Sequence, residues 1–236
     1  MIIRHDRAAA DYLIQDSDFP AICSLVSPHS QGVATLVHPD FLLTAAHAAE
    51  KLQAGSLVII GGAANEVVDV RLHPTWAARA NAMQQGNRFG FADVALLRLG
   101  AAARGIDPLP LCKSSIKPDQ AVTLVGNGIS GTGLTGGDLD DRKWRRATNR
   151  VVELHSEYWF SMRFDPPGSG TDLEGVAGVG DSGSPALIEV GCSWQVAGIA
   201  SWEDSQSAPG RGQYGTMKFY VASRAIAHWI DSVVDS

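Results

Sequence analysis

The chain has 236 residues, of which 45% are hydrophobic and 19% charged, a balance typical of a globular protein with a substantial core. Its net charge of -6 argues against nucleic-acid binding, which requires clustered lysine and arginine. No stretch approaches the roughly 18 consecutive apolar residues that a membrane-spanning helix needs. We therefore expect neither nucleic acid nor a membrane among the partners of this protein.

Short segments with the composition of β-strands follow one another, separated by turns rich in Gly, Pro, Asn and Asp. The predicted strands cover residues 21–26, 32–37, 41–44, 56–61, 66–72, 93–99, 121–126, 148–155, 159–164, 185–189, 194–201 and 218–221. They form two groups of six, and the prolines at 108, 110 and 118 mark the break between the groups. Residues 222–233 have the apolar spacing of an amphipathic helix.

Three cysteines, Cys23, Cys112 and Cys192, cannot all pair within one chain. None of them belongs to a CxxC motif, so the sequence predicts neither a zinc site nor a redox motif. One disulfide among the three is compatible with this count, but we favour buried free thiols.

Three segments carry a histidine, an aspartate and a serine in that order. They read TAAHA at 44–48, FADVALLRL at 91–99 and GDSGSP at 180–185. A serine hydroxyl is a poor nucleophile at neutral pH, so it needs an imidazole to take its proton and a carboxylate to hold that imidazole in the right tautomer. An esterase of the α/β class is disfavoured, because those enzymes place the serine in a Gly-x-Ser-x-Gly elbow ahead of the histidine.

These motifs and several others make the chain resemble the chymotrypsin/trypsin family of serine peptidases over nearly its whole length. The matching segments are FP at 19–20, VATLVHPDFLLTAAHA at 33–48, VRLHPTW at 70–76, DVALLRL at 93–99, VTLVGNG at 122–128, GDSGSP at 180–185, VAGIASW at 196–202 and AHWI at 227–230. The resemblance implies an all-β fold of two six-stranded antiparallel β-barrels with a C-terminal helix. We expect one trypsin-like domain, with barrels at about 20–105 and 118–221 and a helix at about 222–234.

The resemblance also implies an active site in the cleft between the barrels. His47 and Asp93 would come from the first barrel and Ser182 from the second, and the backbone N–H groups of Gly180 and Ser182 would form the oxyanion hole. The implied function is that of a serine endopeptidase, which hydrolyses peptide bonds through an acyl-enzyme on Ser182. This chemistry requires no cofactor and no metal. We expect a monomer whose partner is a peptide or protein substrate.

Asp181 precedes the predicted nucleophile. In the resembled family, this aspartate pairs with a free α-amino group, usually that of an isoleucine. Ile2 or Ile3 could take this part here, although the usual Ile-Val-Gly-Gly start is absent. A buried carboxylate without a partner costs several kcal/mol. We therefore expect Asp181 to find a cation or hydrogen-bond donors, with the N-terminus as the first candidate.

The specificity pocket follows from the same resemblance. Val176, six residues before the nucleophile, would form its floor, and Ser201, Trp202 and Glu203 would form one wall. Glu203 stands where glycine is usual and would either narrow the mouth or attract a basic group. The loop at 172–174 is an alternative source of a carboxylate. Because a valine floor cannot compensate a cation, we expect a small or medium apolar side chain before the scissile bond.

Two departures from the family pattern motivate an alternative function. Ala48 replaces a common cysteine, so a family disulfide is missing, and the N-terminus is unusual. The alternative is a zymogen-like or non-catalytic binding protein that retains the protease fold. The family works mostly outside the cytoplasm, so we expect a secreted or periplasmic protein supplied as the mature chain. Because the first residues lack the features of a secretory signal, a cytoplasmic location is the alternative.

Overall fold

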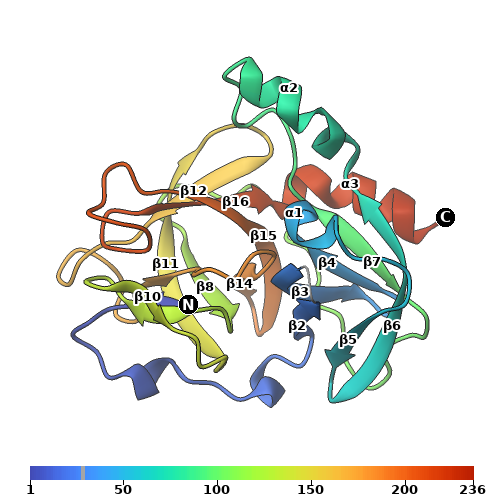
Figure 1. Cartoon of the computed structure of the whole chain (residues 1–236), viewed down its shortest axis with the longest axis horizontal. Helices are drawn as coiled ribbons and strands as arrows, with labels where there is room; N and C mark the ends of the chain where they lie inside the picture. The colour runs from blue at the N-terminus through green and yellow to red at the C-terminus, as the bar shows by residue number, and fades with distance from the viewer. Residues whose placement is uncertain (28–29) are drawn as a thin grey trace.

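The computed structural model describes residues 1–27 and 30–236 (Figure 1). Its first unit is a six-stranded antiparallel sheet in the order β2-β3-β4-β7-β6-β5. The strands are β2 (Ile22–Ser27), β3 (Ser30–His38), β4 (Phe41–Thr44), β5 (Ser56–Ile60), β6 (Ala63–Leu72) and β7 (Ala95–Leu99). The edge strands β2 and β5 approach each other, so the sheet forms a nearly closed barrel.

The second unit is a closed barrel in the order β11-β12-β16-β15-β14-β8. Its strands are β8 (Ala121–Gly126), β11 (Arg145–Leu154), β12 (Trp159–Arg163), β14 (Pro185–Val190), β15 (Ser193–Asp204) and β16 (Met217–Ala222). Most of β11 alternates between buried and less buried residues, as expected for a strand with one face in a core. The predicted all-β fold with two six-stranded barrels is confirmed.

A third, small sheet joins the N-terminus to the second barrel and was not predicted. It has the order β10-β9-β1-β13. Its strands are β1 (Ile2–Ile3), β9 (Ser130–Thr132), β10 (Gly136–Leu139) and β13 (Gly175–Val176). β1 lies between β9 and β13, so the first residues of the chain are tied to the loops around the second barrel.

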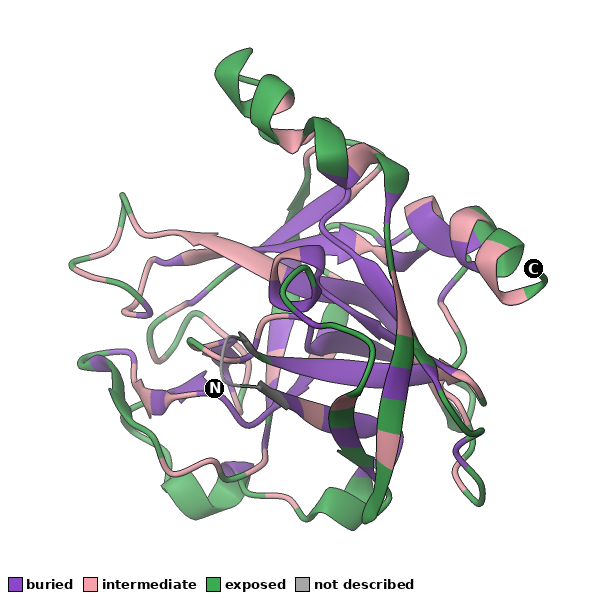
Figure 2. Cartoon of the chain, turned by 45° about the vertical axis from the view of Figure 1, so that its right-hand side comes forward, coloured by how far each residue is buried: buried purple, intermediate pink, exposed green. Residues whose placement is uncertain are grey.

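The helices are few and short. They are α1 (Ala46–Ala49), α2 (Arg79–Gln84) and α3 (Ser223–Val234), with 3-10 turns at Ala9–Tyr12, Asp16–Asp18 and Pro74–Ala78. α2 is largely exposed and projects from the body, whereas the strands beneath it are buried (Figure 2). Within the described residues, no helix is long and apolar enough to cross a membrane.

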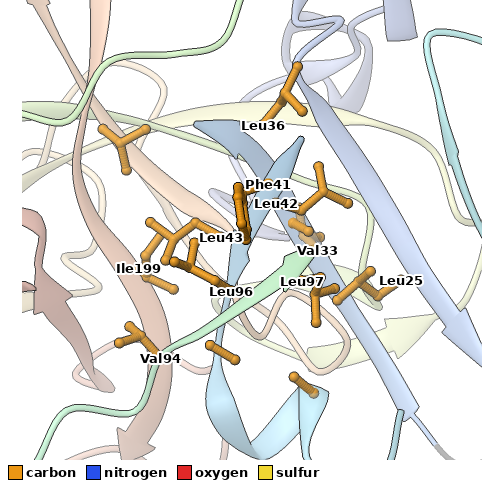
Figure 3. Packing of buried hydrophobic residues seen from close by; sticks show 14 of the residues in the cluster. Leu25, Val33, Leu36, Phe41, Leu42, Leu43, Val94, Leu96, Leu97 and Ile199 are labelled. Atoms are coloured by element: carbon orange, nitrogen blue, oxygen red, sulfur yellow. The ribbon is translucent and has the colours of Figure 1, made fainter. Parts of the chain in front are cut away.

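One apolar cluster fixes the two barrels relative to each other. Leu42, Leu43, Leu96 and Leu97 of the first barrel are fully buried, and Ile199 of β15 belongs to the same cluster (Figure 3). Full burial of one such side chain contributes about 1.5–3 kcal/mol. The shared core therefore sets the separation between groups carried by different barrels.

Both ends of the chain also bridge the barrels. The N-terminal segment begins at the second barrel and runs across to the first, and α3 leads back from β16 towards the first barrel (Figure 1). Ile226 and Ile230 of α3 are buried in the shared core, and Val233 lines a small surface cavity with Phe41 of β4.

The three cysteines are unpaired. Cys23 and Cys112 are buried, whereas Cys192 is exposed, so the expectation of buried free thiols is wrong for Cys192. Burial raises the pKa of the Cys23 thiol to about 12, which keeps this thiol protonated and unreactive at neutral pH.

Candidate active site

His47, Asp93 and Ser182 come from three separate segments and meet between the barrels. His47 lies in α1, directly after β4; Asp93 lies just before β7; and Ser182 lies in the loop between β13 and β14. The Nε2 atom of His47 is 2.8 Å from Oγ of Ser182, and its Nδ1 atom is 2.6 Å from Oδ2 of Asp93. The backbone N–H of His47 also donates to Oδ1 of Asp93, at 2.9 Å.

These contacts decide the tautomer of His47. An ionised carboxylate only accepts hydrogen bonds, so Nδ1 of His47 donates its proton to Asp93. The lone pair of Nε2 is then left facing the hydroxyl of Ser182. In this arrangement the imidazole is placed where it could accept the serine proton.

Asp93 is buried and has a further partner that the sequence did not indicate. The hydroxyl of Ser201, at the start of the half-buried end of β15, donates to Oδ2 of Asp93. The sequence assigns Ser201 only to the wall of the pocket. No sequence signal distinguishes this contact, because it depends on how β15 packs against the loop that carries Asp93.

The environment of His47 shifts its basicity. Burial alone would lower the pKa of its imidazole, but the hydrogen bond and the negative charge of Asp93 more than offset burial, so the pKa is raised above the ordinary histidine value. A base works only when it is unprotonated. We therefore expect kcat/KM to rise with pH through a midpoint above that of an ordinary histidine. A pH profile of kcat/KM with a peptide substrate measures it, and a midpoint below the ordinary value would contradict this account.

The segment around Ser182 has two glycines in the left-handed region, Gly180 at φ +88° and Gly183 at φ +83°. The carbonyl of Ser182 accepts from the backbone N–H of Val33 at 2.8 Å, which ties the loop to the first barrel. Within residues 1–27 and 30–236, no hydrogen-bond partner is recorded for the backbone N–H of Gly180 or Ser182. Among the described residues these two donors are therefore unused, as an oxyanion hole requires.

Gly183 cannot carry a side chain. A Cβ atom there would lie 2.1 Å from Oγ1 of Thr44 and 2.3 Å from the carbonyl oxygen of Val33. The left-handed backbone alone costs about 1–3 kcal/mol for other residues, and this overlap adds to it. We expect Gly183→Ala to lower the free energy of unfolding by more than 2 kcal/mol or so, as measured by urea denaturation. Gly168→Ala is the matched control, because Gly168 also has positive φ but meets nothing within 4 Å.

The carboxylate of Asp181 is fully buried and has three partners. Its Oδ2 atom lies 2.6 Å from the α-amino group of Met1 and accepts from the backbone N–H of Gly178 at 2.8 Å. Its Oδ1 atom accepts from the backbone N–H of Gly128 at 2.7 Å. The N-terminus thus supplies the cation, as expected, but the amino group belongs to Met1.

Ile2 and Ile3, named above as candidates for this part, do not provide the amino group. Both isoleucines lie in β1 and pair with Val176 and Gly175 of β13. Burial lowers the pKa of the Met1 amine, and the charge of Asp181 offsets part of that shift.

A cavity of about 290 Å³ opens beside Ser182. Ser201, Trp202 and Glu203 line it, as the sequence suggested, but Val176 does not. Val176 is fully buried and clusters with Ile2 and Phe164 behind the cavity. The prediction of a valine floor is corrected, because the β1–β13 pairing takes this residue out of the cavity.

Two cations that line this cavity were not predicted from the sequence. Lys218 of β16 and Arg211 of the preceding loop both line it, and both contact the carboxylate of Glu203. The carboxylates of the 172–174 loop lie elsewhere: Asp172 pairs with Arg7, and Glu174 accepts from Thr171. Glu203 does attract basic groups, which was one of the two alternatives expected for it. These groups are Lys218 and Arg211 of the chain itself.

A second and larger cavity continues from His47 along β15. It has a volume of about 800 Å³ and is lined by His47, Trp76, Arg88, Trp202 and ten further residues. Trp202 stacks on Phe219 of β16 with ring centroids 3.9 Å apart, which fixes the wall between the two cavities. Within the described residues, no group of three or more His, Cys, Asp or Glu side chains could hold a metal ion.

Two six-stranded barrels with one shared core define the trypsin-like fold class. The family model described as Trypsin matches residues 14–230 of the chain. The chain therefore belongs to the trypsin family. A comparison with curated proteins finds no significant match.

Proposed function

We propose that the chain is a serine endopeptidase that cleaves peptide bonds through an acyl-enzyme on Ser182. The observation that carries this proposal is the continuous hydrogen-bonded chain from Ser182 through His47 to Asp93. Membership of the trypsin family supports a hydrolase of the serine protease type.

The first half of the proposed reaction forms the acyl-enzyme. Oγ of Ser182 attacks the carbonyl carbon of the scissile bond while Nε2 of His47 takes the hydroxyl proton. The carbonyl oxygen becomes an oxyanion that accepts from the N–H groups of Gly180 and Ser182. The C–N bond then breaks, and the proton on His47 passes to the leaving amine.

The second half releases the other product. A water molecule takes the place of the amine, gives a proton to His47 and attacks the acyl carbon. The bond between that carbon and Oγ of Ser182 breaks, and the proton returns to Oγ. Asp93 stays ionised throughout and stabilises the imidazolium in both halves.

The end of β15 favours an extended peptide as the substrate. β15 pairs with β16 up to Asp204, but its pairing with β14 ends at Ile199. Among residues 1–27 and 30–236, the backbone groups at 201–204 therefore have no strand partner on one edge, beside the larger cavity. An exposed strand edge binds an extended chain through main-chain hydrogen bonds.

Digestion of an unfolded protein tests this function. The wild-type chain should produce internal cuts that mass spectrometry of the fragments locates, and Ser182→Ala should produce none. Ser232→Ala is the matched control, because Ser232 is exposed on α3 and its hydroxyl donates to the Trp229 carbonyl of the same helix, away from the site. A folded wild-type chain without any cleavage would overturn the proposal in favour of a zymogen-like or binding protein.

We base the proposed location and oligomeric state of the protein on its family. Trypsin-like proteases are typically secreted, and we infer a secreted or periplasmic protein that acts as a monomer on peptide or protein substrates. The net charge of -6 is the observation against a nucleic-acid partner.

A further inference from the structure

The cavity beside Ser182 contains a buried ammonium group. Lys218 lies in β16, its side chain is 9% exposed, and it lines the same cavity as Ser182. Burial lowers the pKa of this amine, and the neighbouring carboxylate of Glu203 offsets part of the shift. A lysine is rarely buried unless it is paired, because desolvation of the charge costs several kcal/mol.

The counter-ion of Lys218 is shared. One carboxylate oxygen of Glu203 contacts Lys218 and the other contacts Arg211. Burial alone would raise the pKa of Glu203, but the two cations more than offset burial and lower it. Two positive side chains thus share one negative side chain on the wall of the cavity. Asp181 also lines the cavity but is paired with the Met1 ammonium, so one positive charge is left in excess.

A second polar group at the cavity has a proton to donate. The hydroxyl of Tyr220 is buried and, within the described residues, donates to no other group. Tyr220 lines the same cavity as Lys218. Burial raises the pKa of this phenol, so the hydroxyl stays protonated and is able to donate. A buried donor left unpaired costs about 1–3 kcal/mol, so a polar ligand that reached it would be favoured.

These groups discriminate between classes of side chain. An arginine or lysine in the cavity would add a third cation to the two that already share Glu203. An apolar side chain would cover Lys218 and Tyr220 without pairing them. A carboxylate would neutralise the excess charge and could accept from both groups.

We propose that Lys218 determines specificity for the residue before the scissile bond (P1) and that it selects a carboxylate side chain, glutamate or aspartate. The proposal rests on the serine endopeptidase function above, and it replaces the apolar preference expected from Val176. In the free protein Glu203 keeps the buried ammonium neutralised. When substrate binds, the carboxylate of the substrate side chain and that of Glu203 both contact Lys218. Glu203 retains its contact with Arg211.

Peptides that differ only at P1 test the proposal. Glutamate and glutamine have nearly the same shape, so their ratio of kcat/KM isolates the charge. We expect glutamate to exceed glutamine at least tenfold, and arginine and leucine to be poorer than glutamate. A glutamate to glutamine ratio of one or below would overturn the proposal.

A single substitution assigns the preference to Lys218. Lys218→Met removes the buried ammonium and leaves Glu203 paired with Arg211, so the excess positive charge is lost and no charge is left buried and alone. We expect the glutamate to glutamine ratio to fall to about one. Lys113→Met is the matched control, because Lys113 pairs with Asp231 on the exposed surface and its loss should keep the wild-type ratio. An unchanged ratio in the Lys218 variant would overturn the assignment.

Binding separates failure of this inference from failure of the proposed function. In Ser182→Ala, calorimetry with product-like peptides that end in Glu, Gln or Leu measures the preference of the cavity without any turnover. Tighter binding of the peptide ending in Glu supports the inference even for an inactive chain. Equal or weaker binding than the peptide ending in Gln overturns it, even if the wild-type chain cleaves proteins.

Discussion

Asp93→Asn should lower kcat by about 10⁴-fold while leaving the protein folded, which is the general behaviour of a Ser-His-Asp constellation. Asp93 accepts from Nδ1 of His47, from the His47 backbone and from Ser201. An amide in its place offers an N–H towards Nδ1, so the imidazole turns to the tautomer that carries its proton on Nε2. That nitrogen can then no longer accept the proton of Ser182.

The measurement is kcat with a peptide substrate, together with thermal unfolding to show that the variant is folded. Asp40→Asn is the matched control, since Asp40 also faces a histidine, His38, but across 3.7 Å on a partly exposed surface. Its kcat should stay at the wild-type value. A loss of less than tenfold in Asp93→Asn would show that Asp93 does not orient the base.

Asp181→Asn should lower the free energy of unfolding by about 3–5 kcal/mol, because it leaves the Met1 ammonium buried without a counter-ion. The substitution also removes one of two acceptor oxygens used by the N–H groups of Gly128 and Gly178. Asp181 adjoins both oxyanion donors, those of Gly180 and Ser182. Activity should therefore fall together with stability.

Urea denaturation at neutral pH measures the change in stability, and kcat/KM measures the change in activity. Asp231→Asn breaks the exposed pair with Lys113 and provides the control, since such a pair contributes about 0–1 kcal/mol. A decrease below 1 kcal/mol or so for Asp181→Asn would mean that the pair with Met1 is not formed in solution.

The features that the sequence predicted well depend on residues that are close together in the chain. The strands of both barrels are contiguous apolar segments bounded by turn residues, and the structure confirms their grouping. His47, Asp93 and Ser182 each stand in a short, distinctive segment, so each could be nominated from a few neighbours.

The specificity cavity could not be predicted because it depends on long-range pairing. β1 and β13 have two residues each, too few to show a pattern, yet their pairing buries Val176 and brings Met1 to Asp181. Lys218 lies in β16, where four consecutive residues are buried, so alternation gave no indication of which side chains face the cavity. Glu203 was the charged residue that the sequence placed in the wall of this pocket. Its partners Lys218 and Arg211 come close to it only through the strand pairing that closes the second barrel.

The most direct test of the account is the intact mass of the chain before and after treatment with a fluorophosphonate, with Ser182→Ala as the control. The account predicts one stoichiometric adduct on the wild-type chain and none on Ser182→Ala, because only a hydroxyl deprotonated by His47 beside free oxyanion donors reacts in this way. A folded wild-type chain that takes up no label, or a label that persists in Ser182→Ala, would contradict it.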